Sequence, residues 1–345
     1  MLNGFEGAIG KAAHIQSEIA KAALLVKSNA PKIQLPGAAE AGLAKKTGKK
    51  SLNMKVAAID SGMLTYSFRY LDIAAIRPAG VVFDYAESRL VAHEYYPSKN
   101  PPFQSFAWSA LEYIEAAGAA SIARLNCEVG MAARIAEEKK PGMILIDGSL
   151  VPLISDKPKT GSPLEAEYGK LIGEYKRLFT ACEENSITLV GFAKDSRGRR
   201  FVQSLVKAGV TLNALERASD LSIMQHVLDG GERSVALPYA QEQNTNPILA
   251  DFGQWGGKAM VFYLKPSDLS QVYRIEFLKT PAANEDTVAS DCLALCMFGK
   301  RYQYPPPLIE ADMMASAKAR DIKIFEAEAS RIGGDKKVRD DRPFR

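Results

Sequence analysis

The chain has 345 residues, of which 47% are hydrophobic and 24% are charged, which is the composition of an ordinary globular protein. Lysine and arginine number 44 against 40 acidic residues, so the net charge of +4 permits a nucleic-acid partner without requiring one. No apolar run reaches the roughly 18 residues that cross a bilayer, and Glu6, Lys11 and Glu18 interrupt the N-terminal segment. We therefore expect no membrane span, no signal peptide and a cytoplasmic protein whose four cysteines are free thiols.

The first region, residues 1–50, is expected to be an N-terminal helix followed by a basic linker. Apolar side chains recur at three-to-four spacing up to about residue 28, which is typical of an amphipathic helix. Two interpretations of this helix stay open: it packs on its own domain, or it contacts a second protein. The lysine-rich stretch 45–50 is expected to be a solvated loop rather than a DNA clamp.

Two later apolar runs share one design. Residues 55–59 lead into Asp60, and residues 143–146 lead into Asp147, with small residues after each aspartate. Each run predicts a buried strand that stops at its aspartate. If the two strands lie side by side, both carboxylates point into one cleft at the carboxyl edge of the sheet.

The remaining pattern alternates between strand and helix periods. Strands are expected near 64–76, 80–86, 89–95, 186–192, 259–264 and 272–277. Helices are expected near 103–139 (with a break near Gly118), 164–184, 284–298 and 308–332, with a helical insertion around 205–257 and a charged tail at 333–345. This order predicts an α/β domain over 51–332: a ribonuclease H-like mixed sheet flanked by helices, an order that actin-type and sugar-kinase ATPases share less closely.

Any chemistry must depend on carboxylates. The only histidines are His14, His93 and His226, and none forms a paired metal-binding motif. No Walker loop and no nucleophile elbow is present. Carboxylate oxygens suit hard cations such as Mg²⁺ and Mn²⁺, and two such ions can hydrolyse a phosphodiester. We expect a third acid, Glu128, to join Asp60 and Asp147 from the helix beside them.

Four segments together resemble the successive motifs of the NurA family of nucleases, which act with the hexameric HerA ATPase in DNA double-strand break end resection. They are Ile59–Gly62, the helix Arg124–Arg134, Ile146–Leu150 and Tyr304–Asp312. The resemblance spans about 56–315. It implies a ribonuclease H-like homodimer, Mn²⁺-dependent cleavage of DNA (Mg²⁺ being the other candidate ion), and both 5′-to-3′ exonuclease and single-strand endonuclease activity.

By match of motif, the resemblance implies that Asp60, Glu128 and Asp147 are metal ligands and that Tyr304 orients water or substrate. Asp312 stands where the family commonly has histidine, and it offers oxygen ligands to the same ions. The first motif reads Asp60-Ser61-Gly62, where the family often has Asp-Gly-Ser. We expect metal binding to persist, with a changed pH preference and a changed Mn²⁺ selectivity.

Cations that could hold DNA phosphates follow the strand expected at 186–192. They are Lys194, Arg197, Arg199 and Arg200. Their place at the edge of the same sheet favours phosphate contacts over a merely solvated surface, and Lys194 also resembles a family motif lysine.

Two other functions stay open. In an actin-type ATP-binding protein, Asp60-Ser61-Gly62 would begin a phosphate loop, although the only candidate for the second loop, near Gly230, has the wrong setting. In a non-catalytic DNA-binding or partner-binding subunit, the acids would not converge.

Overall fold

The computed structural model describes residues 3–68, 70–109, 111–241, 246–299 and 301–331. The strands are β1 (Ala44–Lys46), β2 (Met54–Ser67), β3 (Leu71–Ala86), β4 (Arg89–Tyr96), β5 (Gln104–Ser109), β6 (Met143–Asp147), β7 (Thr188–Ala193), β8 (Glu232–Ser234), β9 (Leu237–Pro238), β10 (Ala259–Lys265) and β11 (Tyr273–Leu278). The α-helices are α1 (Asn3–Ser28), α2 (Tyr113–Lys139), α3 (Glu165–Glu184), α4 (Arg200–Lys207), α5 (Asp220–Val227), α6 (Pro247–Asp251), α7 (Glu285–Cys296), α8 (Pro306–Ala315) and α9 (Ala319–Arg331).

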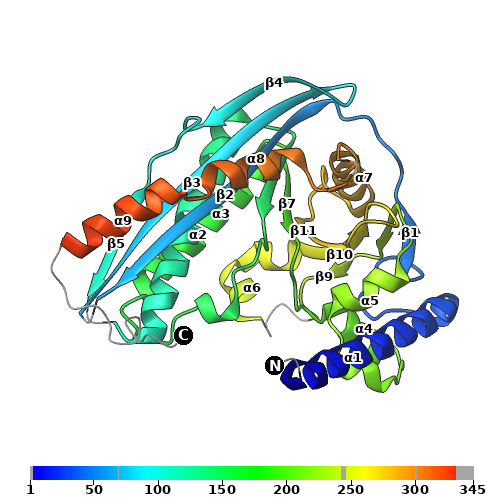
Figure 1. The fold of residues 1–345 in the computed structure, drawn as a ribbon. Helices are drawn as coiled ribbons and strands as arrows, with labels where there is room; N and C mark the ends of the chain where they lie inside the picture. Colours follow the sequence, from blue (N-terminus) through cyan, green and yellow to red (C-terminus); the bar gives the residue numbers. More distant parts are fainter. Residues whose placement is uncertain (1–2, 69, 110, 242–245, 300, 332–345) are drawn as a thin grey trace.

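One large mixed sheet carries the fold (Figure 1). Its order in the described residues is β1-β8-β10-β11-β7-β6-β2-β3-β4, with β5 beside β3 and β9 beside β10. Strand β6 lies parallel to both β2 and β7, and the other pairs are antiparallel. The expected adjacency of the two central strands is confirmed, since Ile59 pairs with Ile146.

Helices cover both faces of this sheet, and strand alternation decides which residues meet which layer. In β2, Ala57 and Ile59 join the core beneath α2 and α3, whereas Val56 and Ala58 join the core beneath α7 and α8. Figure 1 shows α8 lying across β2 and β3, with α2 and α3 behind them. The expectation of a mixed sheet flanked by helices is confirmed.

The expected end of the first strand at Asp60 is wrong. Strand β2 continues through Asp60 to Ser67 and pairs with β3 along its whole length. The segment expected as a strand at 64–76 therefore contains the hairpin turn between two long strands. The small residues after Asp60 do not make a turn: Ser61 contacts α2 and Gly62 packs against α8, as described below.

Three other boundaries differ from expectation. The segment expected to begin a helix at 103 forms strand β5, because Gln104–Ser109 alternates and completes the free edge of β3. Helix α2 then runs to Lys139 without the expected break at Gly118. The helix expected at 308–332 is two helices: α8 ends at Ala315 and α9 begins at Ala319.

The N-terminal helix is present, and its two halves differ. Ile19, Ala23 and Val26 pack into a core that α5 shares, whereas Phe5 and Ile9 lie exposed. Lys45 and Lys46, the first two residues of the lysine-rich stretch, lie in strand β1 against β8 rather than in a loop. Among the described helices, none is both long and apolar enough to cross a membrane. The charged tail expected at 333–345 lies outside the described residues.

Candidate metal centre

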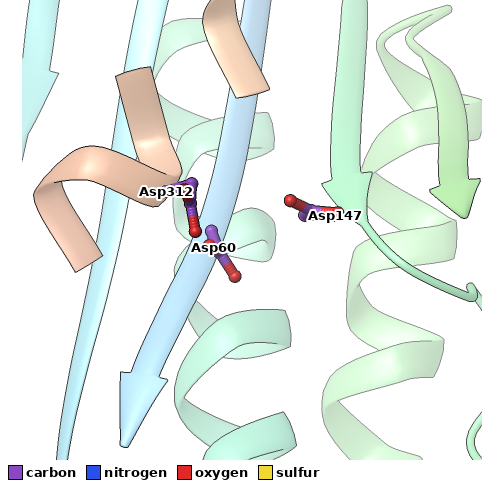
Figure 2. A group of neighbouring side chains, drawn as sticks. All are labelled: Asp60, Asp147 and Asp312. Atoms are coloured by element: carbon purple, nitrogen blue, oxygen red, sulfur yellow. The ribbon is translucent and has the colours of Figure 1, made fainter. Parts of the chain in front are cut away.

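Three aspartates from distant parts of the sequence meet at one point. Asp60 lies on β2, Asp147 ends β6 and Asp312 lies on α8. Each offers a carboxylate oxygen, and these oxygens all lie within 4.8 Å of one another. Figure 2 shows the three side chains converging from the two strands and the helix. Oxygen atoms from three carboxylates form a donor set that suits a divalent cation such as Mn²⁺ or Mg²⁺.

The parallel pairing of β2 with β6 places the first two acids together. Because Ile59 is opposite Ile146, the next residues, Asp60 and Asp147, are also neighbours across the two strands. Asp60 lies on the same face of the sheet as Ala58, and Asp147 lies on the same face as Leu145, because residues two apart in a strand point the same way. Both of these apolar residues face the α7 and α8 layer. The two carboxylates therefore point toward the helix that supplies Asp312.

Gly62 brings that helix close to the strand. A Cβ atom at this position would lie 2.1 Å from the main-chain oxygen of Ala315, at the end of α8. Only glycine permits such an approach between helix and strand. Asp312 lies one turn before Ala315 on the helix, so the close contact at Gly62 sets the height of Asp312 above Asp60.

Glu128 lies next to this centre, and its carboxylate is outside the group of three whose oxygens converge. It is fully buried on α2, on the opposite face of β2, and Ser61 Oγ and Arg124 Nη1 both donate to its Oε2. Adjacent residues of a strand face opposite ways, so α2 meets Ser61 and not Asp60. In this arrangement Glu128 holds Ser61, the residue beside Asp60, and its expected role as a direct metal ligand stays a prediction.

Lys194 and Tyr304 both contact Asp147. Lys194 Nζ donates to Asp147 Oδ2 at 2.9 Å, and Tyr304 Oη donates to Asp147 Oδ1 at 2.9 Å. The ammonium group also lies 4.5 Å from the centre of the Tyr304 ring. Burial alone would lower the pKa of Lys194, but the hydrogen bond and charge of Asp147 prevail and raise it. Burial and the charge of Asp147 raise the pKa of Tyr304, so its hydroxyl keeps its proton.

The arginines of the basic segment (194–200) divide into two groups. Arg197 and Arg199 are exposed, and Arg199 donates to the main-chain oxygen of Leu215 at 2.7 Å. Arg200 is buried, and it donates to Pro238 O and Ser204 Oγ. Its guanidinium group serves the packing of α4 in this structure, and the expected phosphate contact of Arg200 stays a prediction.

The electrostatics of the centre favour a bound cation. Burial, followed by the charges of Glu128, Asp147 and Asp312, raises the pKa of Asp60 to about 7. Burial also raises the pKa of Glu128, against the lowering effect of Arg124. Carboxylates that oppose one another's ionisation in this way are relieved by a divalent ion. The residues present therefore fit a metal.

Three residues that support the centre were not predicted from the sequence. Ser61 and Arg124 hold Glu128, and the spacing of Arg124 four residues before Glu128 on one helix was an available signal. Glu276 contacts the turn after Asp147. Its signal was a charge inside the apolar strand 273–278.

Comparisons with known proteins identify a family and a shared fold. A family model described as the NurA domain matches residues 54–317. The crystal structure of the NurA nuclease from Sulfolobus solfataricus is similar at a TM-score of 0.59 and 15% identity, covering 95% of this chain and 94% of that chain. A crystal structure of NurA bound to dAMP and manganese is similar at a TM-score of 0.57 and 9% identity, covering 93% and 95%.

A crystal structure of NurA with manganese is similar at a TM-score of 0.50 and 9% identity, covering 83% of this chain and 91% of that chain. At these identities the structural likeness shows a shared fold. Among curated protein sequences, none matches this chain significantly.

Proposed function

Since this chain belongs to the NurA family, we propose that it is a metal-dependent DNA nuclease whose active site is the cluster of Asp60, Asp147 and Asp312. The observation that carries this proposal is the convergence of the three carboxylates. The related NurA structure that contains dAMP and manganese supports Mn²⁺ as the ion and DNA as the substrate, with Mg²⁺ as the second candidate ion.

Each residue then has a role that follows from its contacts. Asp60, Asp147 and Asp312 would hold the cation. When bound, such ions activate water and stabilise the leaving oxygen of a phosphodiester. Tyr304 keeps its proton and holds one oxygen of Asp147, so it fixes the orientation of that carboxylate. Lys194 pairs with the other oxygen of Asp147, and with a cation bound at that carboxylate its ammonium group would be free to contact a DNA phosphate.

The wider assignment is part of the same proposal. The large sheet is a ribonuclease H-like domain over residues 51–332, after an N-terminal helix and linker over 1–50 and before a tail over 333–345. The family resemblance supports 5′-to-3′ exonuclease and single-strand endonuclease activity in double-strand break end resection, with a homodimer in the cytoplasm that works beside a hexameric HerA-type ATPase. The exposed Phe5 and Ile9 of α1 are a surface on which such a contact can be tested.

A nuclease assay on single-stranded and double-stranded DNA with Mn²⁺, Mg²⁺ or EDTA tests the proposal. We expect cleavage with a divalent ion, no cleavage in EDTA, and a folded but inactive Asp60→Ala variant. Asp84→Asn, a half-buried aspartate on the neighbouring strand β3, is the matched control and should keep activity. DNA binding without cleavage in any metal would instead favour a non-catalytic subunit, and ATP binding would favour the actin-type alternative.

A further inference from the structure

Strand β11 carries two charged residues in the interior of the protein. Arg274 is 6% exposed and Glu276 is 2% exposed. They alternate with Tyr273, Ile275 and Phe277, which belong to the apolar core on the other face of the sheet. Burying a charge is costly unless it is paired and hydrogen-bonded, so the contacts of these two residues indicate what they hold in place.

Glu276 holds the turn that follows Asp147. Its Oε2 accepts from Ser149 Oγ at 2.6 Å and from the main-chain N–H of Leu150 at 2.9 Å. Between Asp147 and Ser149 the chain passes through Gly148, whose φ of +125° favours glycine. The turn therefore leaves the strand abruptly and depends on Glu276 to fix its direction.

Arg274 extends this contact away from the turn. Its Nε donates to Glu276 Oε1 at 2.6 Å, and its Nη1 donates to Tyr263 Oη at 2.9 Å. The hydroxyl of Tyr263 donates in turn to Asp220. All four side chains are buried, so they form one continuous polar network inside the protein (the β11 network: Asp220, Tyr263, Arg274 and Glu276).

The far end of the β11 network holds the basic segment. Asp220 accepts from the main-chain N–H groups of Phe201 and Val202 at 3.0 and 2.8 Å, at the start of α4. The N–H of Asp220 donates to Gly198 O at 2.9 Å. The network therefore runs from the turn after the aspartate of β6 to the loop that carries Arg197 and Arg199.

We propose that Glu276 is a positioning residue for Asp147. In this proposal the β11 network fixes the position of the turn after Asp147 relative to the basic segment (194–200). This inference rests on the proposed function, because a nuclease needs its metal site and its phosphate-binding cations to contact the same DNA strand at a fixed spacing. Groups behind the direct ligands orient them, and their loss typically costs 10–100-fold in metal affinity or activity.

The test compares Glu276→Ala with the wild type in Mn²⁺ titration and in DNA cleavage. We expect Mn²⁺ affinity and kcat to fall about 10–100-fold, with KM for DNA changed less than about twofold. Glu276→Gln keeps an oxygen acceptor for the Leu150 N–H and should recover part of the loss. The matched control is Glu285→Ala, which removes a buried glutamate of α7 that pairs with Lys279. It should leave the Mn²⁺ affinity and kcat unchanged.

Hydrogen exchange of the metal-free protein separates this inference from the proposed function. In Glu276→Ala, the amides of residues 147–151 should exchange faster, whether or not the wild type cleaves DNA. Faster exchange in a protein that binds no Mn²⁺ would overturn the proposed function and keep the anchoring. Unchanged exchange would overturn the anchoring, and unchanged Mn²⁺ affinity and kcat in a variant of an active wild type would overturn the positioning of Asp147. If Glu276→Ala does not fold, Ser149→Ala removes one of the two anchoring bonds, and normal exchange and affinity in that variant would overturn it equally.

Discussion

Replacing Asp60 with asparagine should stabilise the metal-free protein while it abolishes metal binding. In the folded chain the pKa of Asp60 is raised to about 7, against about 3.9 in an unfolded chain. Below pH 4 both states carry the proton, so the group contributes nothing. Between pH 4 and 7 only the unfolded state releases it, and stability falls by about 1.36 kcal/mol per pH unit. Above pH 7 the full cost, about 4 kcal/mol, applies.

Asparagine has nearly the same shape and no charge, so Asp60→Asn removes this cost. We expect its free energy of unfolding in EDTA to exceed that of the wild type by up to about 4 kcal/mol at pH 8 and by about 1.5 kcal/mol at pH 5. Urea denaturation at a series of pH values measures the difference. Adding Mn²⁺ should narrow the gap, because only the wild type gains binding free energy.

The control for this experiment is Asp84→Asn, which lies outside the acidic cluster and should show no comparable rise with pH. An Asp60→Asn protein that is less stable than the wild type at pH 8 would refute the reasoning. So would a difference that stays constant from pH 5 to pH 8, because the effect would then not come from the ionisation of Asp60.

Three further changes test other parts of the centre. Gly62→Ala should push α8 away from β2, lowering Mn²⁺ affinity and cleavage at least about tenfold together with the melting temperature, whereas Gly173→Ala, which meets nothing within 4 Å, should leave all three intact. Asp312→Ala should weaken Mn²⁺ binding in a calorimetric titration; equal occupancy would show that this aspartate is no ligand. Arg197→Ala with Arg199→Ala should reduce the slope of log K for DNA against log salt by about 1 to 2, and an unchanged slope would remove both from the DNA interface.

The sequence was sufficient to predict the central pair of strands and the three converging acids, two of them from the strand pattern and Asp312 from the family resemblance. Residues 56–59 and 143–146 are apolar throughout, which is typical of strands buried on both faces. Each run leads directly to an aspartate, so the pairing of the two runs brings Asp60 and Asp147 together. Local pattern and tertiary pairing agree here, and for that reason the prediction succeeds.

The sequence was not sufficient where a distant contact decides the local structure. Asp60-Ser61-Gly62 has the composition of a turn, yet it lies inside β2 because β3 pairs along it and α8 requires the glycine. The strand Gln104–Ser109 merges with the helix pattern after it, and only the free edge of β3 selects the extended form. Glu128 has a helix position near the site, but the partners of its carboxylate depend on which face of β2 its helix covers.

Alternate residues of β2 face two different helix layers, so the centre would not tolerate an insertion or deletion in the strand before Asp60. Deleting or inserting one residue before Asp60 would exchange the acid and the neighbouring hydroxyl between the two helix layers. The carboxylate would then face the buried layer that carries Glu128, away from Asp312. Homologues should therefore vary in length in the connection between β2 and β3 and in the other connecting loops, while the stretch from Met54 to Gly62 keeps its residue count.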